Sequence, residues 1–252
     1  MDAVNRPRRC CARLCRTAPP FPPPLVVAVA EQSGKIGFLT AAVLNATLRQ
    51  LSLWIRAGLN MRVSVNLSPH NLRDTELPDV VARALETWRV RAELLTLEIV
   101  ESSVIHSLSE AASILQRLKG LGVKLAIDDF GTGYSCLAYL RQLPLDELKV
   151  DRAFVRNLRQ SKEDRQLVQA TIDLAHNFDL RAVAEGVEDE ATLGTLRDMG
   201  CDLIQGYVLS PALEAERFAG TLSRLTTECE DRCQAANLQE ALGLLGMRLL
   251  RG

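Results

Sequence analysis

The sequence contains few of the residues that bind zinc. Only three histidines occur, and the seven cysteines form no Cys-x-x-Cys pair. Structural and catalytic zinc sites draw mainly on these two residue types, so a zinc site is not expected. Cysteines with this spacing are interpreted as reduced thiols, which favours a cytoplasmic location.

Long apolar runs and an excess of one charge are missing as well. No apolar run reaches the roughly 18 residues that a membrane-spanning helix needs. The basic start, which is followed by a short apolar run interrupted by prolines, matches a secretion signal poorly. The formal net charge is -1. Without a positive excess, neither nucleic acid nor an anionic membrane is an expected partner.

The composition is otherwise that of a globular protein, with 47% hydrophobic and 24% charged residues among 252. One large α/β domain would use most of this length. Residues 1–24 stand apart because they are rich in arginine, cysteine and proline, a composition that predicts neither a helix nor a central strand. We expect a disordered or artefactual leader over 1–24, a barrel domain over 25–220, and a helical extension over 221–252.

Within the domain, hydrophobic periodicity predicts strands that alternate with helices. The strands are expected at 62–66, 95–99, 124–127, 148–150, 181–184 and 202–204. The helices are expected at 38–57, 77–88, 107–119, 163–177 and 191–199. This order predicts a parallel sheet with helices outside it, and six strands where a closed barrel needs eight. An open doubly wound sheet is the alternative, weakened because no glycine-rich dinucleotide motif follows the first strand.

Polar residues follow or end every predicted strand. They are Asn66, Glu98, Asp128, Asp129, Lys149, Glu185 and Gln205. In a parallel barrel these ends meet on one face, where active sites lie. Several carboxylates at one place repel each other unless a cation joins them, and an all-oxygen ligand set suits Mg²⁺, Mn²⁺ or Ca²⁺.

The adjacent Asp128 and Asp129 could bind two ions, with one carboxylate bridging them. Two metals beside Lys149 form an arrangement suited to phosphodiester hydrolysis. Each residue alone has a simpler explanation: Asn66 as a turn residue, Glu98 and Glu185 as solvated or paired strand ends, Lys149 as a surface charge. Their recurrence at six strand ends favours the functional interpretation.

The same residues carry a resemblance to a known family. The segments are VNLS from Val65, LEIVES from Leu97, AIDDFGTGYS from Ala126 with LKVD from Leu148, AEGVED from Ala184, and GCDLIQGYVLSPAL from Gly200. Over roughly residues 28–218 the chain resembles the EAL domain family of cyclic di-GMP phosphodiesterases. The resemblance implies a TIM-like (β/α) barrel of the EAL type that cuts cyclic di-GMP to linear pGpG and that forms a homodimer.

The resemblance also implies roles for individual residues. Asn66, Glu98 and Asp128 would bind one Mg²⁺ or Mn²⁺ ion, and Asp128, Asp129 and Glu185 would bind a second. Lys149 and Glu185 would be catalytic, with Lys149 assisting the attacking water. Gln205 would line the site. Glu101 would anchor the loop Gly131–Ser135, which leads to the dimer interface in this family.

The front of the chain departs from the family pattern. No glutamate precedes Glu31, and the triplet at Glu240 lies in a predicted helix, so the family's Glu-Ala-Leu strand is missing. The barrel is therefore expected to be incomplete at its N-terminus, and hydrolysis to be weak unless a segment with that motif is added. The alternatives are an inactive cyclic di-GMP-binding or regulatory module, and a non-functional fragment left by a frameshift.

Overall fold

A computed structural model describes residues 22–59, 61–105, 108–131 and 140–211, together with residues 213, 215 and 218. Several expectations lie outside these residues. They are the leader up to residue 21, the predicted helix start at residue 107, most of the loop after Gly131, the extension over 221–252 and the triplet at Glu240.

The sheet contains six parallel strands in the order β1-β2-β3-β4-β5-β6. Their bounds are β1 Val63–Leu67, β2 Leu95–Val100, β3 Lys124–Phe130, β4 Glu147–Val150, β5 Arg181–Glu185 and β6 Leu203–Gln205. Spatial order equals sequence order, without the reversal of a doubly wound sheet. Because parallel crossovers are right-handed, such an order places the connecting helices on one side of the sheet.

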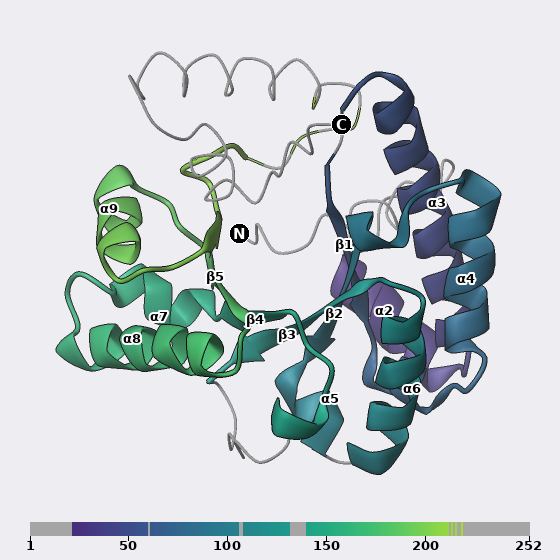
Figure 1. Ribbon diagram of the computed structural model, residues 1–252, viewed down its shortest axis with the longest axis horizontal. Helices are drawn as coiled ribbons and strands as arrows, with labels where there is room; N and C mark the ends of the chain where they lie inside the picture. Colours follow the sequence, from purple (N-terminus) through teal and green to yellow (C-terminus); the bar gives the residue numbers. More distant parts are fainter. Residues whose placement is uncertain are drawn as a thin grey trace.

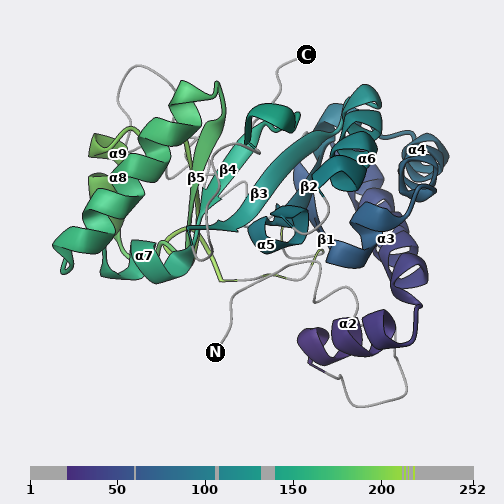
Figure 2. The same ribbon diagram turned by 90° about the horizontal axis from the view of Figure 1, so that it is seen from below.

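Helices flank this sheet, most of them on its outer side. The helices are α2 Pro23–Gln32, α3 Ile36–Arg56, α4 Leu77–Trp88, α5 Glu101–Ile105, α6 Leu108–Gly120, α7 Arg152–Asn157, α8 Lys162–Asn177 and α9 Glu190–Asp198. Among them, α2 packs against α3, and α5 lies beside the ends of β2 and β3. Short 3-10 turns lie at Pro69–Arg73, Ala92–Leu94 and Leu140–Gln142. The strands form an arc, with α3, α4 and α6 outside β1 to β3 and α7 to α9 outside β4 and β5 (Figures 1 and 2). The prediction of a TIM-like barrel with six of eight strands is confirmed.

Alternation along each strand separates an apolar outer face from a polar inner face. Val65, Leu97, Ile127 and Leu148 are at most 1% exposed and belong to the core beneath the helices. The residues between them point to the concave side of the arc. The same alternation therefore builds the core and delivers the charged side chains to the barrel interior.

Three helices were not predicted. α2 begins at Pro23, so the expectation that residues 1–24 contain no helix is wrong at its end. Proline is tolerated there because the first helical N–H groups need no intrahelical acceptor. The short helices α5 and α7 are too brief for periodicity to reveal.

The helix α3 is long and apolar enough to cross a membrane by length and composition, with a hydropathy of 1.2. Its side chains Val43, Leu44 and Leu48 are buried in the core, and the helix packs against α4 and β1. A core helix of a globular domain can have the same length and hydropathy. The absence of a membrane span therefore stays a prediction.

Asp146, just before β4, links this strand to the end of α6 and the start of β3. Its carboxylate accepts hydrogen bonds from Lys119 at 2.5 Å, from Lys124 at 2.9 Å and from the Leu125 amide at 2.9 Å. Burial opposes ionisation of Asp146, but these donors outweigh it and hold its pKa below the ordinary value. The ionised carboxylate therefore stabilises the folded chain.

Replacing Asp146 by asparagine is expected to lower the free energy of unfolding by about 1–3 kcal/mol near neutral pH. Since the pKa is lower in the folded state, this contribution is present above the unfolded pKa of about 4 and is lost as the pH falls through the folded value. Urea unfolding of both proteins at pH 7 and in acid measures the loss of stability at neutral pH and its disappearance at low pH. An equal difference between the two proteins at both pH values would contradict the pairing.

Candidate metal and phosphodiesterase site

The carboxyl ends of the strands bring the predicted site residues to one edge of the sheet. In the strand register, Asn66 lies beside Glu98, Asp128 beside Val100, and Glu185 beside Gln205. Parallel pairing keeps these positions at the same height, so residues from strands that are distant in the sequence become neighbours in space.

Lys149 of β4 lies at the centre of the site and is 3% exposed. Its Nζ atom is 3.1 Å from Glu98 Oε1, 3.0 Å from Asp128 Oδ1 and 2.5 Å from Glu185 Oε1. One ammonium group thus contacts carboxylates from three different strands. The interpretation of Lys149 as a surface charge is wrong, because the strand that carries it is covered on both faces.

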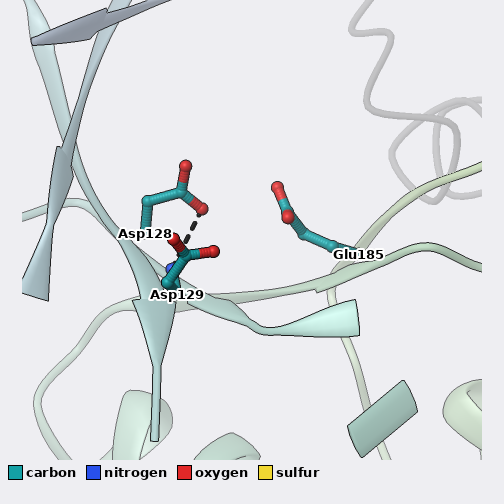
Figure 3. A group of neighbouring side chains, drawn as sticks. All are labelled: Asp128, Asp129 and Glu185. Atoms are coloured by element: carbon teal, nitrogen blue, oxygen red, sulfur yellow. Dashed lines mark hydrogen bonds between the residues drawn. The ribbon is translucent and has the colours of Figure 1, made fainter. Parts of the chain in front are cut away.

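Asp128, Asp129 and Glu185 form a second grouping, in which the nearest carboxylate oxygens all lie within 4.8 Å of one another. Figure 3 shows the Glu185 side chain extending from β5 toward the two aspartates of β3. Asp129 has a left-handed backbone, with φ at 57°, and its amide donates to Asp128 Oδ1 at 3.1 Å. This turn directs both consecutive aspartates into the same space, which a regular strand would not do.

The site carries more negative than positive charge. Four carboxylates, those of Glu98, Asp128, Asp129 and Glu185, surround the single ammonium group of Lys149. Burial, then repulsion by Asp128, raise the pKa of Asp129 to about 6. Burial also raises the pKa of Glu98, and it raises the pKa of Glu185 to about 7. The positive charge of Lys149 opposes both increases but does not cancel them.

These residues fit divalent cations. Raised pKa values show that ionised carboxylates are costly here, and a bound cation removes this cost because it replaces the competing protons. The donor set consists of carboxylates with an amide nearby, which suits Mg²⁺, Mn²⁺ or Ca²⁺. The described residues therefore form a site that could bind divalent cations.

The other predicted residues lie around this centre. Asn66 is half-buried on β1, and Gln205 on β6 lines a cavity of about 90 Å³ together with Glu98 and Lys149. Glu101 is 2% exposed and accepts a hydrogen bond from the Gly131 amide at 3.1 Å. Glu101 thus contacts the first residue of the loop that it is predicted to anchor, and residues 132–135 of that loop lie outside the described residues.

Two further residues join the site: Ser64 was missed from the sequence, and Asp151 was marked only as the polar residue that follows Lys149. The Ser64 hydroxyl is hydrogen-bonded to Glu98, which lowers the cost of ionising that group. Asp151 caps α7 through the Ala153 amide at 2.6 Å and also hydrogen-bonds with Asp129. Ser64 could have been found from its position two residues before Asn66, on the same face of β1. Asp151 likewise lies two residues after Lys149.

Comparison with known proteins agrees with this geometry. A model of the EAL domain matches residues 9–212, so this chain belongs to the EAL domain family. The match begins within the predicted leader and ends close to the predicted domain boundary.

Two curated relatives come from Pseudomonas aeruginosa. The chain is 43% identical over 192 residues to the cyclic di-GMP phosphodiesterase NbdA and 37% identical over 196 residues to the bifunctional diguanylate cyclase/cyclic di-GMP phosphodiesterase MucR. These matches cover 76% and 77% of this chain but only 24% and 29% of the relatives. The chain thus spans about a quarter of their length.

Solved structures show the same fold. The MucR phosphodiesterase in complex with c-di-GMP superposes with a TM-score of 0.76 at 36% identity, covering 81% of this chain and 83% of the other. The EAL domain of Mycobacterium smegmatis DcpA gives 0.71 at 37% identity, covering 75% and 86%.

Proposed function

We propose that this chain forms a phosphodiesterase domain that hydrolyses cyclic di-GMP to linear pGpG with the help of two Mg²⁺ or Mn²⁺ ions. The observation that carries the proposal is the convergence of Glu98, Asp128 and Glu185 on Lys149 at the carboxyl end of a parallel sheet. The names of the relatives, and a neighbour solved with c-di-GMP, support this substrate.

The assignment of ligands follows the strand ends. Asn66, Glu98 and Asp128 would hold one ion, and Asp128, Asp129 and Glu185 the other. When bound, such a pair lowers the pKa of a water molecule and stabilises negative charge on the phosphate. Gln205, at the rim of the same cavity, would contact the nucleotide.

Lys149 acts in this proposal as a fixed positive charge. Burial favours its neutral form, but the carboxylates of Glu98, Glu185 and Asp128 raise the pKa of Lys149 well above its ordinary value. A lysine that keeps its proton cannot remove one from water. It can donate hydrogen bonds that hold the carboxylates and an attacking water in place.

A regulatory module that binds cyclic di-GMP without cutting it is the second candidate. The observation that favours it is that none of the six described strands carries a Glu-Ala-Leu triplet. Homodimer formation and a cytoplasmic location also remain predictions. The Glu101–Gly131 contact supports the first of these, since the loop that it anchors leads to the dimer interface in this family.

The test measures conversion of cyclic di-GMP to pGpG by the 252-residue chain in Mg²⁺, Mn²⁺ or Ca²⁺. The same chain preceded by the Glu-Ala-Leu segment of a relative is assayed in parallel. We expect turnover with Mg²⁺ or Mn²⁺, not with Ca²⁺, and at least roughly 10² faster in the extended chain, by analogy with loss of one preorganised group. Calorimetric binding of cyclic di-GMP without turnover by either form would support the binding module instead.

A further inference from the structure

Three charged residues meet inside the barrel, at the end of the strands opposite the metal site. Arg62 Nη1 is 2.9 Å from Glu147 Oε1, and Arg181 Nη2 contacts the same oxygen. Glu147 is 7% exposed. We call Arg62, Glu147 and Arg181 the basal cluster.

Each member of the basal cluster precedes a site residue by an even number of positions, Glu147 and Arg181 on the same strand and Arg62 from the position directly before β1. The pairs are Arg62 and Asn66, Glu147 and Lys149, and Arg181 and Glu185. Even spacing on a strand returns to the same face, so each pair points into the barrel interior. Two and four residues correspond to about 7 and 13 Å along a strand. The basal cluster therefore lies one to two residue layers below the site.

The contact between Arg62 and Glu147 crosses the concave side of the sheet. Backbone hydrogen bonds join only neighbouring strands, and β2 and β3 lie between β1 and β4. The two residues are 85 positions apart in the sequence. This ion pair is a direct link across the arc, so it constrains the curvature that sets the separation of β1 from β4 and β5.

Burying these charges is costly in comparison with apolar packing. Barrel interiors are commonly filled by branched aliphatic residues, and replacing a buried ion pair by such residues is often neutral or stabilising. Between the basal cluster and the site lies the polar cavity of about 90 Å³, which Thr96 lines with a buried hydroxyl that has no hydrogen-bond partner. Water in this cavity would solvate the ions. Even with such solvation, apolar side chains would serve stability at least as well, so stability alone gives no reason for charges at this place.

We propose that the basal cluster is a positioning device for the metal site. By linking β1 to β4 and β5 from below, it holds Asn66 at the separation from Lys149 and Glu185 that binding of two cations requires. Its members are positioning residues in this proposal, since they lie one to two residue layers below the carboxylates assigned to the cations. This inference rests on the proposed function.

The test compares Glu147→Gln with Asp146→Asn. Asp146 is the adjacent residue and also accepts from two cationic side chains, Lys119 and Lys124, but none of these three residues lines the cavity below the site. Both variants remove one charge from the same end of β4. Mn²⁺ affinity is measured by titration calorimetry. The kcat and KM for cyclic di-GMP are measured in whichever of the two forms, the 252-residue chain or the extended chain, hydrolyses it. All measurements are made well below the melting temperature of each variant.

Glu147→Gln is expected to weaken Mn²⁺ binding and to lower kcat by about 10- to 100-fold, with KM changed less than about threefold, as for other groups that orient metal ligands. Asp146→Asn should lower only the melting temperature. Arg62→Lys, which keeps the charge, should retain more Mn²⁺ affinity than Arg62→Met. If Glu147→Gln does not fold, the comparison of Arg62→Lys with Arg62→Met still tests the positioning role.

Unchanged Mn²⁺ affinity and kcat in Glu147→Gln and Arg62→Met would overturn the positioning role, even if both variants are less stable. Failure of the proposed function has a different signature. In that case the unsubstituted chain binds no Mn²⁺, or Asp128→Asn binds it as well as the unsubstituted chain does, and the positioning role is overturned together with the metal site.

Discussion

Replacing Asp128 by asparagine is expected to reduce cyclic di-GMP turnover by a factor on the order of 10³, by analogy with removal of a preorganised catalytic group. Asp128 contacts Lys149 at 3.0 Å, accepts from the Asp129 amide, and is assigned to both cations. Asparagine keeps the shape and one acceptor but removes the charge. The loss should therefore appear in kcat and in Mn²⁺ affinity.

The fold should survive this substitution. Asp128 contributes to raising the pKa of Asp129, Glu98 and Glu185, so removing its charge relieves repulsion among buried carboxylates. We expect a melting temperature, measured without added metal, equal to or above that of the unsubstituted chain. Glu93→Gln, at a pair that is about half exposed, is the control and should leave turnover unchanged. Near-normal turnover in Asp128→Asn would refute the metal assignment.

Replacing Lys149 by methionine is expected to lower both stability and turnover. The substitution leaves Glu98, Asp128 and Glu185 facing one another without the ammonium group that contacts all three. Removing one partner of a buried ion pair commonly costs about 3–5 kcal/mol. Turnover should fall by roughly 10²-fold or more, because the donor that orders the site is lost.

Added Mn²⁺ distinguishes the two effects of Lys149→Met. Cations neutralise the same carboxylates, so saturating Mn²⁺ should restore a large part of the melting temperature while turnover stays low. Thermal unfolding with and without Mn²⁺, alongside the hydrolysis assay, measures both. If Mn²⁺ restored turnover fully, Lys149 would be a structural counterion only. If Mn²⁺ gave no stabilisation, the carboxylates would not form a cation site.

Most of the regular structure could be predicted from the sequence because side-chain alternation is a local property. Five of the six described strands were placed within one residue at each end, the end of β3 was missed by three residues, and α4 was predicted with its observed bounds, Leu77–Trp88. The misses have local reasons too. Helix α2 begins with prolines, and α5 and α7 have too few turns for a periodic pattern.

The sequence by itself determined which residues stand at the strand ends, since the end of an apolar run is visible in the letters alone. It also predicted an all-oxygen ligand set for the proposed cations. Tertiary structure decided that Lys149 is buried among three carboxylates, that Ser64 and Asp151 join the site, and that Arg62 meets Glu147 across the barrel. These contacts depend on strand order and sheet curvature, which arise only when segments distant in the chain pack together, and no local pattern encodes them.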